Sequence, residues 1–588
     1  MTTGIDIAVA AVPLLLAGVL LVGFLWPATR AMPLAWGAAL AVGYFAWNMP
    51  VNWLAAASAV GVITAITILW IVFGALVLLY TLMEAGAFDR INRGFATVSD
   101  DRRVQIVLIA FFMATFIEGA AGFGTPAAVV APLLLGLGFP ALAAVVAAII
   151  GHIIAVTYGA VGTPIIVGIQ NPLADVAFTR DAIEAGGMTV EEFSFEVAAW
   201  AATYHALVGF VMPLFAVGMI VYFFGDPDDR SLAPAWEVAP LCLFAGISFA
   251  VPYWVSAWFL TAEFPSLIGS MVGGAIVLSA LRAGYFLPDE EWEFPERDRW
   301  PDHWVGSIEP GQSNGSNGGS PESRGGVSPE AEAADLSGGE DMSLLKAWSP
   351  YVALVILLVV TRAVDPISNF IGSDPFVIGF SDILGTTLGG SFAWMSVPGF
   401  WLIVSAVLAI PIFGMSGEEV SDAWKEAGRK IVSPFIALVF VIAMVQVMLQ
   451  SGAHPGAPEV GSMIVLLAQT TADALGVAYP AFASLIGALG AAMAGSNTVS
   501  NITFGAFQFE AATQLGLPRT VIVGAQAVGG AIGNLVAIHN LVAALATVGL
   551  LGQEGRVMRL NMIPLLYYAT GVGLLCLLFS YVLFTGVF

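Results

Sequence analysis

Residues 118–140 read EGAAGFGTPAAVVAPLLLGLGFP, a glycine-rich stretch that prolines interrupt inside a strongly apolar chain. A related stretch, residues 495–518, reads GSNTVSNITFGAFQFEAATQLGLP. In each, an apolar run of helix length leads to a Gly-x-x-Thr break, and a second short helix then ends at Gly-x-Pro. Helix breaks at membrane depth are tolerated where they face protein or a polar cavity. The pattern predicts two re-entrant broken hairpins, at residues 104–138 and 479–515, which form two halves of one transport site.

The composition places these hairpins in a membrane protein. Of 588 residues, 58% are hydrophobic and only 10% are charged, and the mean hydropathy is +0.88. A soluble domain carries about one quarter charged residues. Many runs reach the length that crosses a hydrocarbon core, and backbone hydrogen bonding in lipid requires that they be helices. The sequence therefore predicts an all-α polytopic membrane protein with about 12 transmembrane helices besides the two hairpins.

Charge and cysteine usage narrow the setting. The formal net charge is -23, and lysine occurs only at Lys346, Lys425 and Lys430. This balance is typical of a protein bathed in concentrated salt, and it predicts a halophilic microbe, although one acidic loop could inflate the total. Cys242 and Cys576 lie inside apolar runs, so we expect no disulfide, metal site or cofactor. We also expect no nucleic-acid partner, while a homodimer stays open.

Three parts follow one another along the chain. Residues 1–287 form an N-terminal membrane half with the first hairpin, and residues 344–588 form a C-terminal half with the second. Between them, residues 288–343 are rich in Gly, Ser, Pro and Glu, and such a segment cannot bury enough apolar surface to offset its ordering entropy. It is expected to be a disordered, acidic cytoplasmic linker. Residues 453–477 are left open as a span, a re-entrant piece or a surface helix.

The charges of the loops indicate the orientation. Basic residues, including Arg90, Arg93, Arg102 and Arg103, follow the third span, whereas residues 171–197 are acidic. Because positive loops stay in the cytoplasm, both termini are predicted outside a multi-pass protein of the cell membrane. The expected spans are residues 5–26, 33–47, 56–83, 141–170, 198–224, 239–258, 266–281, 350–362, 398–413, 431–450, 520–550 and 562–587.

An internal repeat relates the two halves. LMEAGA at residues 82–87 matches MLQSGA at residues 448–453, and each motif closes the span that precedes its hairpin. The first hairpin starts beside basic residues and the second beside an acidic spacer. The two units are therefore predicted to be inverted relative to each other, an arrangement typical of secondary transporters. The alternative is chance similarity between glycine-rich apolar segments.

The hairpin tips carry the candidate substrate-binding residues. Glycines allow close approach of the backbone, Pro126 suits the start of a half-helix, and Thr125 is expected to cap it. Two converging helix N-termini suit a carboxylate. Any of these small residues could instead serve helix packing alone. The predicted substrate-binding residues are Gly124, Thr125, Thr163, Ser496, Asn497, Thr498, Asn501 and Asn540.

Three ionisable residues are candidates for proton coupling. Glu118 lies at membrane depth, where an acid is expensive and by default functional. His152 and His539 lie in the two long spans and could relay a proton, because histidine titrates near neutrality. The alternatives are a lasting structural hydrogen bond for Glu118 and ordinary packing for the histidines. Arg362 ends a span, where it could snorkel to the interface or bind a carboxylate.

Several long motifs in order also carry a family resemblance. They are EGAAGFGTPAAVVAPLL, LMEAGAF, EFPSLIG, KAWSPY, GSNTVSNITFGAFQ and GAQAVGGAIGNLVAIHN followed by VGLLGQEG. With them the chain resembles the lactate permease family along nearly its whole length, apart from the linker. The resemblance implies proton-coupled uptake of lactate and glycolate. It also places the chain near the ion-transporter superfamily, some sodium-coupled members of which use Ser-Asn-Thr tips. Here only the second hairpin has Ser-Asn-Thr, which puts a paired sodium site in doubt.

The function predicted from these observations is import of lactate or a related 2-hydroxy monocarboxylate by proton symport with alternating access. One alternative is a sodium-coupled transporter of another organic anion, such as a dicarboxylate. A more remote one is a membrane-embedded enzyme, but the sequence has no His-Glu-x-x-His motif and no intramembrane Asp pair. The expected partners are thus a small carboxylate and the lipid bilayer.

Overall fold

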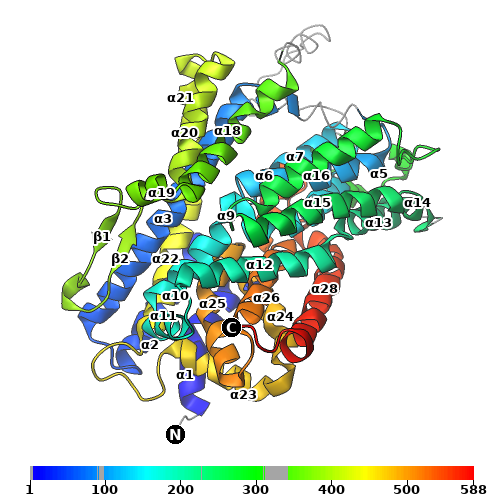
Figure 1. Ribbon diagram of the computed structural model, residues 1–588. Coiled ribbons are helices and arrows are strands. Elements are labelled where there is room, and N and C mark those ends of the chain that lie inside the picture. The colour runs from blue at the N-terminus through cyan, green and yellow to red at the C-terminus, as the bar shows by residue number, and fades with distance from the viewer. Residues whose placement is uncertain are drawn as a thin grey trace.

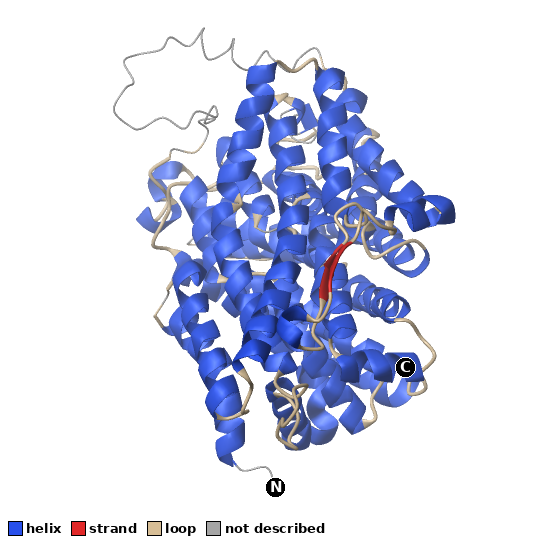
Figure 2. Ribbon diagram, turned by 90° about the vertical axis from the view of Figure 1, so that its left-hand side faces the viewer, coloured by secondary structure: helices blue, strands red, loops and turns tan. Residues whose placement is uncertain are grey.

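The computed structural model describes residues 4–24, 26–88, 90–91, 98–122, 124–226, 228, 230–308, 310 and 342–588. In these ranges the chain is mostly helical (Figure 2), and the strands are two short ones, β1 (Ile378–Phe380) and β2 (Gly390–Phe392), which pair antiparallel. Ten of the described helices are long and apolar enough to cross a membrane, or up to 12 if each of two bent helix pairs is one span. The expected all-α polytopic membrane protein is confirmed.

The described part of the N-terminal half begins with three helices, continues through the first hairpin and a repeatedly broken span, and ends with six helices. Its main elements are α1 (Gly4–Gly18), α2 (Ala28–Phe45), α3 (Val51–Glu84), α5 (Arg102–Gln105), η2 (Ile106–Met113), α6 (Ala114–Ala120), α7 (Thr125–Gly136), α8 (Ala141–Gly151), η3 (Ile153–Tyr158), α9 (Gly159–Ile165), η4 (Ile166–Gln170), α10 (Asn171–Asp175), α11 (Ala177–Ala185), α12 (Val190–Gly209), α13 (Met212–Phe224), α14 (Ala233–Glu237), α15 (Ala239–Phe259) and α16 (Pro265–Arg282).

The C-terminal half has the same order of span, spacer, hairpin and broken long span. Its main elements are α18 (Leu344–Ala363), α19 (Asp365–Ile371), α20 (Pro398–Phe413), α21 (Gly417–Lys430), α22 (Val432–Gln450), α23 (Met463–Leu475), α24 (Tyr479–Ala494), α25 (Asn497–Leu515), α26 (Arg519–Gly533), η10 (Asn534–Val536), α27 (Ile538–Thr547) and α28 (Glu554–Leu578). The segment left open in the sequence, residues 453–477, contains α23, which leads into the first arm of the second hairpin.

Local sequence signals explain where many helices begin. The side chain of Thr189 and that of Glu192 form a reciprocal capping box at the start of α12, and Ser416 and Glu419 do the same at α21. Such boxes satisfy N–H groups that have no partner inside the helix. Helices α16 and α20 instead begin with proline, which has no N–H to lose at the first helical position.

The two hairpins approach the centre from opposite ends of the molecule. In Figure 1, α5 and α7 of the first hairpin lie in the upper part, and α23 and α24 lie in the lower part. Both chain termini lie in the lower half, away from α5 and α21 (Figure 1). This grouping agrees with the inverted arrangement inferred from the loop charges.

Glycines let the second hairpin pack tightly against the long span that follows it. A Cβ atom on Gly529 would lie 2.1 Å from the carbonyl oxygen of Ser484, and one on Gly533 would lie 2.3 Å from that of Ala488. The helices α24 and α26 therefore touch backbone to backbone, as small residues permit in membrane proteins. This contact fixes the first arm of the second hairpin against the long span that follows it in the same repeat.

The first part of the expected linker lies on the protein as a strap, which we define as residues 288–308. Its backbone N–H at Trp292 donates to Asp101 Oδ2 at 2.9 Å, and Glu293 forms an ion pair with Arg102 at 2.9 Å. Arg299 pairs with Asp226 at 2.8 Å. The strap thus crosses the base of the first hairpin. The predicted disorder is therefore wrong for residues 288–308, because these contacts hold them against the protein. Residues 309 and 311–341 of the predicted linker lie outside the described residues.

Candidate functional site

The tips of the two hairpins lie next to each other. Gly124 precedes α7 with a φ of +79°, and Gly495 ends α24 with a φ of +60°, both in the left-handed region that glycine tolerates. Asn540 bridges them, because its Nδ2 donates to the Gly495 carbonyl at 3.3 Å. Its Oδ1 would lie 3.0 Å from a Cβ atom on Gly124. One asparagine side chain therefore spans the gap between the hairpins.

A small cavity of about 30 Å³ lies between the tips. That space is enough for about two or three water molecules, which need roughly 10–15 Å³ each. The cavity is lined by Glu118, Gly122, Gly124, His152, Val156, Gly159, Pro164, Gly495, Ser496, Asn497, Thr498, Asn534 and Asn540. Residues from both hairpins and both broken spans thus surround one central space.

Asn497 is the most unusual side chain at this cavity. It is only 3% exposed, and neither its Oδ1 nor its Nδ2 has a hydrogen-bond partner. Among the described residues, it is the one side chain with two buried polar atoms left unpaired. Gly530 gives it room, since a Cβ atom there would lie 2.0 Å from Asn497 Oδ1. A buried amide without partners is costly, so this geometry suits a polar ligand.

The two helix starts at the cavity differ in how they are capped. Ser496 Oγ accepts the backbone N–H of Val499 at 3.4 Å at the start of α25. The expectation that Thr125 caps α7 is wrong, because Gly124 occupies the cap position. The Thr125 hydroxyl instead donates to the carbonyl of Gly122 at 2.7 Å. That hydroxyl closes the tight turn of the tip, and Thr125 is the first residue of the helix rather than its cap.

Glu118 and His152 form a buried pair on the first repeat's side of the cavity. Glu118 is 4% exposed, and its Oε2 lies 3.9 Å from His152 Nε2. His152 Nδ1 donates to the carbonyl of Ala148 at 2.7 Å, so Nε2 is the nitrogen free to exchange a proton with the acid. Gly159 borders the same carboxyl, because a Cβ atom there would lie 2.3 Å from Glu118 Oε1.

The long span of the first repeat breaks beside this pair. Ala160, Val161 and Gly162 all have positive φ, at 43°, 55° and 76°, which is rare for a β-branched residue such as valine. Thr163 Oγ1 donates to the Ala160 carbonyl at 2.6 Å. Asn501 of α25 donates to the carbonyl of Pro164 at 2.9 Å. The second hairpin thus satisfies a backbone group that the break in the first repeat sets free.

The predicted site residues separate into two groups. Seven line the cavity, namely Gly124, Ser496, Asn497, Thr498, Asn540, Glu118 and His152. The other four, Thr125, Thr163, Asn501 and His539, lie around it. His539 is exposed, and its ring lies against the second tip, where a Cβ atom on Gly495 would overlap it.

Sequence reasoning missed several lining residues. Asn534 accepts a hydrogen bond from Asn540 at 2.8 Å and donates to the carbonyl of Gly530 at 2.9 Å. Its position at the break of the second long span was the available signal. Val156, Gly159 and Pro164 mark the corresponding break in the first repeat. Among the residues that the structure describes, no cluster of His, Cys, Asp or Glu could hold a metal ion. The side chain of Arg362, for which carboxylate binding was considered, lies outside the described part of the structure.

Comparison with known proteins decides the family. The family model described as L-lactate permease matches residues 6–583. The chain belongs to the L-lactate permease family. It is therefore a transporter and a multi-pass membrane protein, and the alternative of a membrane-embedded enzyme is set aside.

Relatives in this family have similar length. The chain is 28% identical over 565 residues to the glycolate permease GlcA of Escherichia coli K12, covering 93% of this chain and 90% of that protein. It is 25% identical over 568 residues to the L-lactate permease of the same strain, with the same coverage. A solved structure of MtrF from Neisseria gonorrhoeae is 13% identical and covers 87% of this chain and 81% of that chain. Its TM-score of 0.40 is too low to establish a shared fold.

Proposed function

We propose that this protein imports lactate or a related 2-hydroxy monocarboxylate, such as glycolate, across the cell membrane by proton symport with alternating access. The observation that carries the proposal is Asn497, a buried amide with both polar atoms unpaired at a cavity between two helix starts. The substrate class is supported by relatives named glycolate permease and L-lactate permease. The acidic composition continues to favour a halophilic source.

The cavity offers complementary groups for a 2-hydroxy acid. The carboxylate would lie at the N-terminal ends of α7 and α25, where N–H groups without helical partners and the helix dipoles favour an anion. Asn497 Nδ2 would donate to the same carboxylate, and Asn497 Oδ1 would accept the proton of the 2-hydroxyl group. Gly124, Ser496, Thr498 and Asn540 would complete the contact surface. Thr125, Thr163 and Asn501 would support it from behind through the bonds described above.

A monocarboxylate is favoured over a dicarboxylate by the charges at the site. Among the described residues that line the cavity there is no lysine or arginine. A second carboxylate would need another cation or amide cluster to offset its desolvation. The alternative of a sodium-coupled carrier of another organic anion is therefore less well supported, although the oxygens of Asn497 and Thr498 leave sodium as a second candidate for the coupling ion.

Proton coupling would use the Glu118–His152 pair, which lies on one wall of the same cavity. A proton arriving on Glu118 would neutralise the acid beside the incoming carboxylate, which removes like-charge repulsion. His152 Nε2, 3.9 Å from the acid, could exchange that proton directly or through one water molecule. His539, whose ring lies against Gly495 of the second tip, stays a further candidate for proton transfer.

The size of the cavity supports the proposal of alternating access. Lactate has six non-hydrogen atoms and needs several times the space of one water molecule, whereas the present cavity has about 30 Å³. The tips would therefore have to separate for the substrate to enter. Inverted repeats offer two related arrangements, one open to each side of the membrane.

Counterflow in proteoliposomes tests this function. Vesicles loaded with unlabelled L-lactate should accumulate labelled L-lactate, glycolate and pyruvate should compete, and succinate should compete weakly. An inward proton gradient should drive accumulation without sodium. Uptake that depends on neither a pH gradient nor a sodium gradient would contradict the proposed coupling. Absence of L-lactate exchange would contradict the proposed substrate.

A further inference from the structure

The segment η3 separates the two residues that border the Glu118 carboxyl. His152 comes directly before it and Gly159 directly after it. His152 Nε2 lies 3.9 Å from Glu118 Oε2, and a Cβ atom on Gly159 would lie 2.3 Å from Glu118 Oε1. The path of η3 therefore sets the distance between the acid and its two neighbours.

This segment needs support from outside, because it is a 3-10 helix of six residues, and runs longer than three or four residues are uncommon. Two of its carbonyl groups are held by buried hydroxyls. Tyr253 donates to the Ile154 carbonyl at 2.9 Å, and Ser266 donates to the Ala155 carbonyl at 2.7 Å. These bonds fix the first half of η3 to α15 and α16.

The second half of η3 is held by a buried triad, which we define as Thr157, His205 and Tyr568. His205 lies on α12 and is 0% exposed. Its Nε2 lies 2.8 Å from Thr157 Oγ1, and its Nδ1 is hydrogen-bonded to the Tyr568 hydroxyl of α28. Thr157 also donates to the Ala527 carbonyl of α26 at 3.3 Å. The triad thus joins the first repeat's broken span to the long span of the second repeat.

One assignment of protons satisfies every member of the triad. If Thr157 donates to the Ala527 carbonyl, its oxygen accepts Nε2–H of His205, and Nδ1 of His205 accepts the Tyr568 hydroxyl proton. The imidazole is then neutral. The Tyr253 ring packs edge-on against it at 5.9 Å, and no charged side chain in the described part of the chain forms an ion pair with it. A neutral, fully bonded histidine holds structure in place.

We propose that His205, acting through Thr157 and anchored by Tyr568, is a positioning residue that fixes η3 and thereby the spacing of Glu118 and His152. The inference rests on the proposed function, because it assigns to the triad an effect on proton-coupled transport. The residue itself touches neither substrate nor proton path. Its effect should appear in the pH profile of transport.

The test compares two near-isosteric variants with matched controls. Thr157→Val and Tyr568→Phe each remove one bond of His205. Tyr567→Phe removes the neighbouring hydroxyl, which donates to the Val208 carbonyl at 3.0 Å. Thr203→Val removes a half-buried hydroxyl of α12 that accepts hydrogen bonds from Trp254 and Trp258 of α15. L-lactate exchange is measured from pH 5 to pH 9 in proteoliposomes, with KM and maximal rate taken separately.

Thr157→Val and Tyr568→Phe should shift the pH midpoint of exchange. They should also lower the rate of L-lactate accumulation driven by a pH gradient in the same vesicles by about tenfold or more, as misplacement of a reacting group does, with little change in the KM of exchange. Thr157→Ser should restore the wild-type profile, and both controls should match the wild type. Unchanged pH midpoints in the two variants would overturn the inference. So would aggregation of both variants beside folded controls, because the triad would then serve stability alone. If the wild type itself fails to exchange lactate, the proposed function fails instead.

Discussion

Asn497 has two unpaired polar atoms at 3% exposure, so its replacement is the sharpest probe of substrate recognition. Asn497→Ala should weaken L-lactate binding by about tenfold to a hundredfold, which is what one hydrogen bond to a charged group is worth. The effect should appear as a raised KM for exchange in proteoliposomes.

Asn561 provides the matched control for this variant. It is a buried asparagine with an unpaired Oδ1, and its Nδ2 donates to the Leu535 carbonyl at 2.8 Å, but it does not line the cavity. Asn561→Ala should change the thermal stability of the protein, with little change in the KM for L-lactate. Equal KM values for Asn497→Ala and the wild type would show that Asn497 does not contact the substrate.

Glu118 should matter for coupling rather than for binding. Glu118→Gln keeps the shape of the side chain but cannot gain or lose a proton, so L-lactate exchange should persist while accumulation driven by a pH gradient is lost. Both are measured in the same vesicles. Glu84→Gln, at the exposed end of α3, is the control and should accumulate lactate normally. Full accumulation of L-lactate by Glu118→Gln would show that this residue does not carry the coupled proton.

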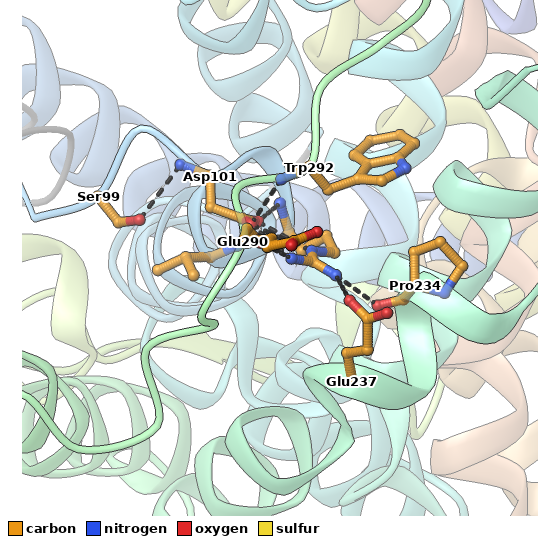
Figure 3. Close-up of polar contacts among 8 residues, drawn as sticks. Ser99, Asp101, Pro234, Glu237, Glu290 and Trp292 are labelled. Carbon is orange, nitrogen blue, oxygen red and sulfur yellow. Dashed lines mark hydrogen bonds and ion pairs between the residues drawn. The ribbon is translucent and has the colours of Figure 1, made fainter.

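At the scale of elements, the base of the first hairpin is held by one buried ion pair. Arg103 is 1% exposed and Asp101 is 0% exposed, and Arg103 Nη2 lies 2.7 Å from Asp101 Oδ2. Figure 3 shows Asp101 together with Glu237 of α14 and Glu290 and Trp292 of the strap. Arg103 donates to Glu237 Oε2 and to the Glu290 carbonyl, both at 2.8 Å. Hairpin, α14 and strap are thus joined at one guanidinium.

Arg103→Met should therefore destabilise the protein strongly. Removing one partner leaves Asp101 buried without its countercharge, which typically reduces the free energy of unfolding by about 3–5 kcal/mol. Thermal unfolding of the purified protein in detergent measures the loss. Arg180→Met is the control, because Arg180 and Asp181 are paired at 44% and 67% side-chain exposure, where a pair is worth about 0–1 kcal/mol. Similar melting temperatures for the two variants would contradict this account of the hairpin base.

Much of the element order could be predicted from the sequence, because it depends on local signals. Apolar runs, Gly-x-x-Thr breaks and Gly-x-Pro ends located both hairpins and most spans. The details of the tips were harder. Whether Thr125 would cap α7 depends on the turn of Gly122 and Gly124, which places its hydroxyl on the Gly122 carbonyl instead. Periodicity alone does not report this choice.

Contacts between segments that are distant in the sequence could not be predicted from it. Asn534 and Asn540 lie at the cavity because the second long span breaks between them. His205 was not singled out, since its partners Thr157 and Tyr568 are 48 and 363 residues away. The position of His539 against the second tip depends on how α27 packs on Gly495. Such residues become recognisable only once the two repeats are folded together.

For the whole molecule, the orientation in the membrane is the open prediction. Both termini should lie outside, and the strap and α21 should lie in the cytoplasm, because the basic loops lie at the same end as these elements. A fluorescent protein fused to the C-terminus and a cysteine introduced at Ser307 should lie on opposite sides of the membrane. The cysteine in the strap should react with a thiol reagent that does not cross the membrane only after the cells are permeabilised. The native cysteines, Cys242 and Cys576, are buried and should not interfere. Labelling of Ser307→Cys in intact cells would contradict the predicted topology.

The most direct measurement for the central claim is an experimental structure of the protein with L-lactate bound. The account predicts the carboxylate between the starts of α7 and α25, with an oxygen of lactate within hydrogen-bond distance of Asn497 Nδ2 and the hairpin tips further apart than in the present structure. Lactate bound away from both tips, or bound between them with the Asn497 amide still unpaired, would contradict it.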